Sequence, residues 1–252
     1  MSPTLLHTLF EAAAYAVGFR LFLRERRRSA LPALADRESS LAIGIGAILG
    51  AALGAKIAYW LYDPAYAFAG LLNGDVPDWK HLLGGKSIIG ALLGGLAGVE
   101  IAKKLDGVRG STGDAFVWPL MLGMAIGRIG CFLSGLDDHT AGNPTALPWG
   151  VDFGDGVPRH PTQLYEVLFL ASWAALLAWR GDRLSRPGDR FRAFMVGYLA
   201  YRLCIEAIRP IPLHYFGVLS GLQLLCVAGL LYYHRDIPRI AREFLDSSRN
   251  SK

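Results

Sequence analysis

The sequence predicts an all-α protein, a polytopic bundle of membrane-spanning helices, and three observations carry that prediction. Of the 252 residues, 52% are hydrophobic, and the mean hydropathy is +0.31, which is more apolar than an average water-soluble domain. The apolar residues gather into runs of roughly 20, the length that lets a helix cross the hydrocarbon core of a bilayer. The 30 glycines favour close helix packing, because small residues let neighbouring backbones approach.

The candidate spans follow one another along the whole chain, which we interpret as a single integral membrane domain over residues 1–252. The seven apolar runs cover residues 4–23, 41–62, 87–105, 113–136, 162–179, 192–208 and 214–234. Two outer connections are long, 63–86 and 137–161. The second is dense in Gly, Pro and Asp, so turns rather than long helices should order it.

The basic residues predict the orientation of the chain in the membrane. Lys and Arg concentrate in the first, third and fifth connections and in the C-terminal tail, whereas the other connections are richer in Asp and His. The positive-inside rule therefore places the N-terminus outside the cytoplasm and the C-terminus within it. The net charge of +5 follows from this topology, so we expect no nucleic acid partner.

Arg128 lies in the middle of a predicted span and has no acidic residue three or four positions away. A charged side chain at the centre of a bilayer costs roughly 2.5–3.5 kcal/mol on insertion scales. Its partner must therefore come from another helix, from the loop or from a ligand. The flanking Gly127 and Gly130 are expected to leave room for a bulky ligand beside the backbone.

Arg202 is a second arginine within a predicted span, and Glu206 follows it one turn later on the same helix face, where the two can neutralise each other. The planar donor fork of a guanidinium also matches the oxygens of a phosphate. We therefore expect Arg128 and Arg202, on two helices, to hold one phospholipid headgroup between them.

Four motifs resemble segments of the bacterial prolipoprotein diacylglyceryl transferase family. They are GRIGCFLSG at 127–135, RHPTQLYE at 159–166, GYLAYRLCIEAIRP at 197–210 and GGKSIIGALLGG at 84–95. Their order and spacing match along nearly the whole chain. The resemblance implies a multi-pass enzyme of the bacterial inner membrane that takes phosphatidylglycerol as donor. Such an enzyme moves the diacylglyceryl group to a cysteine thiol of a prolipoprotein and releases glycerol phosphate.

The resemblance also implies roles for individual residues. Arg128 matches the signature arginine that contacts the lipid headgroup, and Arg202 matches a second essential arginine, with Tyr198 four positions earlier. The remaining residues that the family motifs place in the substrate site are Glu206, Arg209, His160, Gln163, Tyr165 and Glu166.

The chain departs from the family pattern near the reacting centre. Ile89 occupies the position of the family's essential histidine, and Cys131 that of the signature asparagine. Leu136 replaces a glutamate, although Asp137 follows at once, and Glu11 aligns roughly with an N-terminal tyrosine. We therefore predict a phospholipid-dependent transferase whose acceptor is unknown and need not be a prolipoprotein.

The loss of the family histidine leaves the general base open. Glu11 and His160 are the catalytic candidates, and the nearby loop supplies further groups. The alternatives are that Glu11 pairs with an arginine and orders it, and that His160 caps a helix or donates a hydrogen bond. The loop groups are Asp137, Asp138 and His139.

Two other classes of protein compete with this interpretation. The first is a non-catalytic phospholipid-binding or lipid-transport protein, which the replacement by Ile89 favours. The second is a metal-dependent enzyme built on the Asp and His residues of the loop, but their spacing matches no compact ligand motif, so we expect no metal and no other cofactor. Cys131 either carries a covalent intermediate or is a small packing residue.

Overall fold

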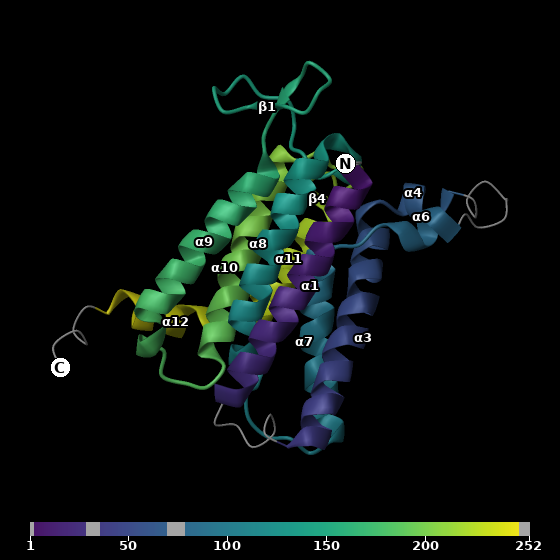
Figure 1. The fold of residues 1–252 in the computed structure, drawn as a ribbon. Helices are drawn as coiled ribbons and strands as arrows, with labels where there is room; N and C mark the ends of the chain where they lie inside the picture. Colours follow the sequence, from purple (N-terminus) through teal and green to yellow (C-terminus); the bar gives the residue numbers. More distant parts are fainter. Residues whose placement is uncertain (1–2, 29–35, 70–78, 247–252) are drawn as a thin grey trace. The chain divides into compact units, whose positions relative to one another are not determined.

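The computed structural model describes residues 3–28, 36–69 and 79–246, and these residues are mostly helical (Figure 1), which confirms a helical protein. Three of the described helical segments are long and apolar enough to cross a membrane by length and composition. They are Arg37–Tyr62, Gly113–Asp138 and Thr162–Arg183. The count of seven spans and the orientation stay predictions. The internal contacts group the chain into two compact units, each of which is described by itself.

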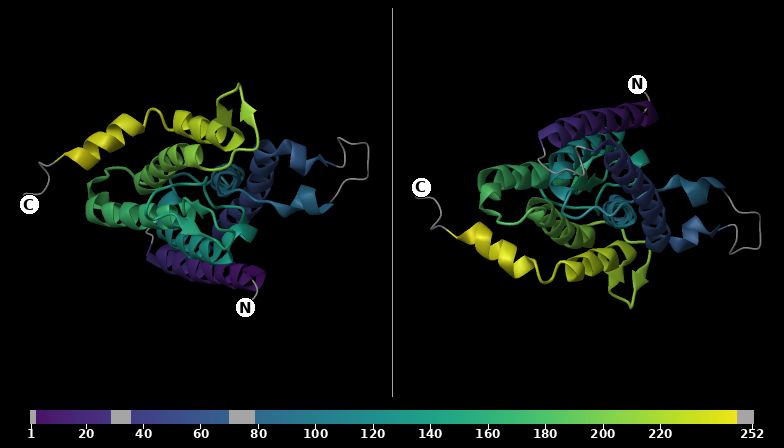
Figure 2. Two further views of the ribbon diagram at one scale, coloured as in Figure 1. Left: turned by 90° about the horizontal axis from the view of Figure 1, so that it is seen from above. Right: turned by 90° about the horizontal axis from the view of Figure 1, so that it is seen from below.

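The first unit comprises residues 1–30, 111–210 and 233–252. Its helices are α1 (Pro3–Arg28), η1 (Gly113–Phe116), α8 (Val117–Ser134), η2 (Gly135–Asp138), α9 (Thr162–Arg180), η3 (Gly181–Arg183), α10 (Asp189–Ile205), η4 (Glu206–Ile208) and α12 (Ile237–Leu245). Helix α1 packs along α8, α8 packs on α9, and α9 packs on α10. The pairing of α1 with α8 is visible in both views of Figure 2.

Asp114, an acidic residue at the edge of a predicted span, ties two elements of this unit together. Its carboxylate accepts hydrogen bonds from the backbone N–H groups of Gly188, at 2.7 Å, and Phe191, at 2.9 Å. These donors lie at the start of α10, where the first N–H groups of a helix have no partner within the helix. A carboxylate at this end also interacts favourably with the helix dipole, so Asp114 fixes η1 against α10.

The connection that precedes α9 is ordered by turns, as its composition predicts. It contains a short hairpin of β1 (Val151–Asp152) and β2 (Pro158–Arg159). The Oδ1 atom of Asp152 accepts backbone N–H bonds from Gly154, Asp155 and Gly156 at 2.8–3.1 Å. This carboxylate is therefore engaged in shaping the loop.

The second unit comprises residues 31–110 and 211–232. Its described elements are α3 (Arg37–Tyr62), α4 (Pro64–Ala67), α6 (Trp79–Gly84), α7 (Ile88–Leu105), β3 (His214–Tyr215), β4 (Leu219–Ser220) and α11 (Gly221–Tyr232). Helices α3 and α7 meet along glycines spaced four residues apart, so that one face of each is bare backbone. A Cβ atom at any of these glycines would lie 2.0–2.5 Å from a carbonyl oxygen of the other helix; they are Gly46, Gly50, Gly54, Gly90, Gly94 and Gly98.

The last predicted span, 214–234, is wrong in its first third. Residues 214–220 form the β3–β4 hairpin, which turns at Gly217 with φ +72°, and the helix begins only at Gly221. The 12 residues of α11 rise about 18 Å at 1.5 Å per residue, less than the roughly 30 Å hydrocarbon core. The apolar composition of 214–220 concealed this turn.

Candidate functional site

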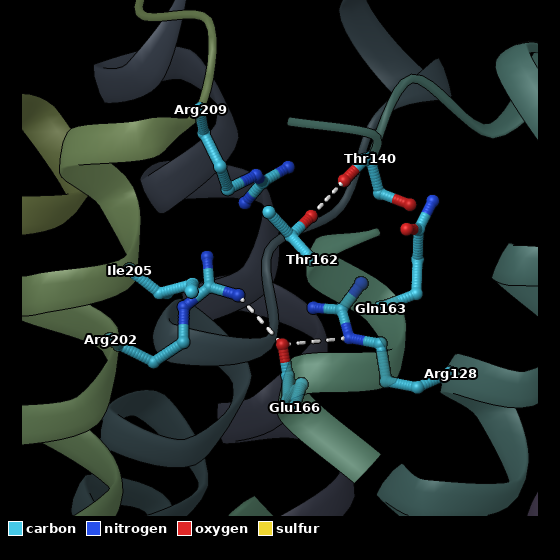
Figure 3. Close-up of a pocket in the computed structure, with 8 residues that line it drawn as sticks. All are labelled: Arg128, Thr140, Thr162, Gln163, Glu166, Arg202, Ile205 and Arg209. Carbon is cyan, nitrogen blue, oxygen red and sulfur yellow. Dashed lines mark hydrogen bonds and ion pairs between the residues drawn. The ribbon is translucent and has the colours of Figure 1, made fainter. Parts of the chain in front are cut away.

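The two predicted arginines converge within the first unit. Arg128 comes from α8 and Arg202 from the last turn of α10, while Glu166 projects between them from the first turns of α9 (Figure 3). The Oε2 atom of Glu166 lies 3.0 Å from Nε of Arg128 and 3.0 Å from Nη1 of Arg202. The partner of Arg128 is thus a carboxylate on another helix, and that carboxylate is shared.

Tyr198 holds the other oxygen of this carboxylate. Its hydroxyl donates to Oε1 of Glu166 at 2.7 Å, from a position one turn before Arg202 on α10. The Glu166 side chain is 3% exposed, so its charge has little access to water. In such an environment a carboxylate persists only when it is paired and hydrogen-bonded, and these three contacts meet that requirement.

A second carboxylate extends the cluster. The Oε2 atom of Glu206, on η4, lies 3.1 Å from Nη2 of Arg202 and 3.4 Å from Nη1 of Arg209. Glu206 is fully buried. The sequence prediction that Arg202 and Glu206 neutralise each other across one helical turn is confirmed. The three guanidiniums and two carboxylates of the cluster leave one positive charge in excess.

A small pocket at this cluster is partly open to the outside. The amide nitrogen and oxygen of Gln163, and the Nε atom of Arg202, are buried without a hydrogen-bond partner among the described residues. A buried polar group without a partner costs roughly 1–3 kcal/mol, so the pocket offers donors that an anion can satisfy. Its lining consists of Arg128, Thr140, Thr162, Gln163, Glu166, Arg202, Ile205 and Arg209.

The two glycines beside Arg128 differ in what they face. A Cβ atom at Gly127 would meet nothing within 4 Å, so this side of α8 is open. A Cβ atom at Gly130 would lie 2.4 Å from Cβ of Phe10 on α1. The prediction that Gly130 makes room for a ligand is therefore wrong, because α1 packs into that space.

His160 and Tyr165 lie in a hydrogen-bonded group beside the loop. The Nδ1 atom of His160 is 3.2 Å from the hydroxyl of Tyr165, which also accepts from Nε1 of Trp149 at 2.8 Å. This contact favours the hydrogen-bonding alternative for His160 over proton transfer. Neither residue lines the pocket at the arginines.

Glu11 lies on α1 among other polar groups rather than in the lining of the arginine pocket. Its Oε1 atom accepts from the hydroxyl of Tyr15 at 3.0 Å, and its Oε2 atom is 3.8 Å from Nε2 of His7. The Nδ1 atom of His7 in turn lies 3.2 Å from Oδ1 of Asp138. His7 was missed from the sequence, although a histidine four positions before Glu11 in an apolar run was a usable signal.

The remaining predicted residues follow the end of α8. Cys131 is partly buried, while Asp137 and His139 are exposed. His139 ends η2 in the left-handed conformation, with φ +54°. Ile89 belongs to the second unit, where it is fully buried on α7.

Comparisons with known proteins agree on one family. A family model described as prolipoprotein diacylglyceryl transferase matches residues 5–233. The phosphatidylglycerol–prolipoprotein diacylglyceryl transferase of Bordetella parapertussis is 36% identical over 185 residues, which is 69% of this chain and 66% of the relative. The proteins of that name from Cupriavidus metallidurans and Geobacter sulfurreducens are 33% and 34% identical, over 82% and 86% of this chain and 77% and 80% of theirs. No solved structure matches.

Proposed function

Because this chain belongs to the prolipoprotein diacylglyceryl transferase family, we propose that it transfers the diacylglyceryl group of phosphatidylglycerol to a thiol acceptor in the bacterial inner membrane. Membership makes it one of a family of transferases, and the names of its relatives supply the donor and a prolipoprotein as the acceptor. The matched segment spans slightly less than two thirds of the Bordetella relative. The seven spans, the outer N-terminus and the single membrane domain belong to the same proposal.

The observation that carries the proposal is the convergence of Arg128 and Arg202 on Glu166. The shared carboxylate holds both guanidiniums in place before a ligand arrives, so little reorganisation is needed when the phosphate binds. The excess positive charge of the cluster matches the single negative charge of a phosphodiester. The amide of Gln163 adds a donor that lacks a protein partner among the described residues.

The reaction follows from this binding mode. The sulfur of the acceptor attacks the C3 carbon of the diacylglyceryl group, and a sulfur–carbon bond forms as the carbon–oxygen bond to phosphate breaks. The electron pair of that bond leaves on glycerol phosphate, whose charge rises, and the thiol proton passes to a base. Arg128 and Arg202 stabilise the developing charge, and removal of one such donor typically lowers kcat by about 10²–10³.

A second candidate function is phospholipid binding without transfer, and Ile89 is the observation that favours it. This apolar side chain, buried in the second unit, cannot accept a proton where the family has its essential histidine. A protein of this kind would bind phosphatidylglycerol and release no glycerol phosphate.

The test measures glycerol phosphate release and thioether formation by purified protein, with phosphatidylglycerol and a peptide that carries a single cysteine. We expect Arg128→Ala and Arg202→Ala to lower the rate by at least about 10². The control is Arg24→Ala, which removes an exposed arginine of α1 and should leave the rate unchanged. Wild-type rates in both site variants contradict the proposal, and lipid binding without any transfer supports the second candidate.

A further inference from the structure

A second cluster of reactive side chains surrounds Cys131, which lies one turn beyond Arg128 on α8. The reaction proposed above makes no use of this cluster. His7 from α1, Cys131 from α8 and Asp138 from η2 each offer one ligand atom, and these three atoms lie within 4.8 Å of one another. We propose that these residues bind a divalent transition metal ion of the zinc type. The proposal departs from the sequence expectation of no metal.

The ligand set fits this kind of ion. Thiolate sulfur, imidazole nitrogen and carboxylate oxygen are the three donor types found at protein zinc sites. Bond lengths of about 2.0–2.3 Å place ligand atoms of one tetrahedral ion roughly 3.3–3.6 Å apart. The Nδ1 atom of His7 and Oδ1 of Asp138 are already 3.2 Å apart, so little movement of these two groups is needed.

The packing of α1 on α8 builds the cluster. Gly130 lets α1 approach, since Phe10 occupies the space that a side chain at 130 would need, and the carbonyl oxygen of His7 lies 3.8 Å from that same position. His7 thereby comes to rest beside Cys131. The η2 turn then brings Asp138, whose side chain is only 9% exposed, against the same imidazole.

Glu11 lies near the second ring nitrogen of His7, on the side where metal-binding histidines have a hydrogen-bond acceptor. A histidine that ligates a metal through one ring nitrogen almost always donates its other N–H to a carboxylate, carbonyl or water, which fixes the tautomer and raises its basicity. While Nδ1 of His7 faces Asp138, Nε2 lies 3.8 Å from Oε2 of Glu11, and a shift of about 0.6 Å would bring these two atoms within hydrogen-bond distance. Tyr15 orients that carboxylate through its hydroxyl. Glu11, the acidic residue of the first predicted span, would thus orient the imidazole of His7.

The charge balance is compatible with the nearby arginine. Cys131 as a thiolate and Asp138 as a carboxylate supply two negative charges, which offset the two positive charges of the ion. Arg128 lies three residues earlier on α8, so its guanidinium has a centre without net charge as its neighbour one turn away. Three protein ligands leave the fourth tetrahedral position open, as in catalytic rather than structural zinc sites.

The role of the open position rests on the proposed function. An acceptor thiol that binds there loses its proton, because a thiol coordinated to zinc is deprotonated, and the proton passes to solvent. The bound thiolate then attacks C3 of the diacylglyceryl group while the carbon–oxygen bond to phosphate breaks. The ion thus supplies the deprotonation that Ile89 cannot provide.

The first experiment tests the metal site without any enzyme assay. The purified full chain is stripped with a chelator and titrated with Co²⁺, which reports a thiolate ligand through a sulfur-to-cobalt charge-transfer band. We expect about one Co²⁺ per chain, displaced by Zn²⁺. Cys131→Asn, which carries the residue of the family signature, and Asp138→Asn should abolish the band, and Glu11→Gln should weaken affinity about 10–100-fold.

The matched control is Cys204→Ser, which removes an exposed thiol of α10 and should leave the band intact. Thermal unfolding of each variant separates loss of a ligand from loss of the fold. Absence of the band in the wild-type protein, or its persistence in Cys131→Asn, overturns the metal site.

The second experiment compares diacylglyceryl transfer by chelated and Zn²⁺-reloaded protein, with the same phosphatidylglycerol and cysteine peptide. Transfer that disappears with the chelator and returns with Zn²⁺ supports the role of the ion. Equal rates in both samples overturn that role. If Co²⁺ binds as expected but no sample transfers the lipid, the proposed function fails while the metal site stands.

Discussion

Replacing the shared carboxylate in Glu166→Gln tests whether one buried charge holds both arginines. Glu166 is 3% exposed and contacts Arg128 and Arg202 at 3.0 Å each. Removing one partner of a buried ion pair costs about 3–5 kcal/mol, because it leaves uncompensated charge behind. Glutamine keeps the shape of the side chain and an oxygen that accepts the hydrogen bond from Tyr198, so the substitution removes chiefly the negative charge. We therefore expect the free energy of unfolding to fall by about 3–5 kcal/mol.

The assay is unfolding of purified protein in mixed micelles by added denaturing detergent, followed by tryptophan fluorescence. Asp182→Asn is the matched control, because Asp182 is 95% exposed and pairs with Arg190 at 3.5 Å, an arrangement worth about 0–1 kcal/mol. The double variant Glu166→Gln/Arg128→Gln should lose less stability than the sum of the single variants, by about 0.5–3 kcal/mol. Equal losses for Glu166→Gln and Asp182→Asn would refute the idea of a shared buried counter-ion.

Two further perturbations address parts of the fold outside the pocket. Gly94→Ala places a Cβ atom 2.2 Å from the carbonyl oxygen of Gly50 and should destabilise the packing of α3 on α7 by about 1–3 kcal/mol. A Cβ atom at Gly44 meets nothing within 4 Å, so Gly44→Ala should stabilise the protein by about 0.5–1 kcal/mol. Thermal melting of the two variants tests whether their effects have opposite signs. At Asp189, burial acts to raise the carboxyl pKa, but hydrogen bonds from Arg239 and Arg192 outweigh it and hold that pKa below its usual 3.8. The stabilisation of α12 by the Asp189–Arg239 ion pair should therefore be complete at neutral pH, and it should be lost as the pH falls below 3.8 through the lowered pKa of Asp189. A spin label attached at Ala241→Cys on α12 should then become more mobile. Unchanged mobility across that pH range contradicts the role of this ion pair.

Much of the fold could be predicted because it depends on local properties of the chain. Runs of apolar residues must be helical in a bilayer, where every backbone N–H and C=O has to be satisfied within the segment. The predicted spans therefore fall on helices, and the Asp- and Gly-rich connection before α9 is ordered by turns. The exception is 214–220, where an apolar hairpin has the composition of a span but the turn geometry of a loop.

The candidate site was only partly predictable. A mid-span arginine without a neighbour on its own helix already indicates a partner elsewhere, and the four motifs correctly identified the family. The sequence could not identify that partner as Glu166, because Glu166 is 38 positions from Arg128 and contacts it only through the packing of α8 on α9. The motif placed Glu166 in the substrate site without indicating that it is the shared counter-ion of two arginines.

The sequence alone was enough to predict a helical protein with segments long and apolar enough to cross a membrane, to identify its family and to single out Arg128 and Arg202. Hydropathy, charge and motif spacing can all be read from short stretches of neighbouring residues. Three-dimensional packing decided the rest: Glu166 bridges α8 and α10, Phe10 fills the space at Gly130, and His7 meets Cys131 and Asp138 across more than a hundred positions of chain. Such pairings depend on how closely two helices approach and which faces they turn toward each other. Those distances arise from the combined packing of many side chains, which no short segment encodes.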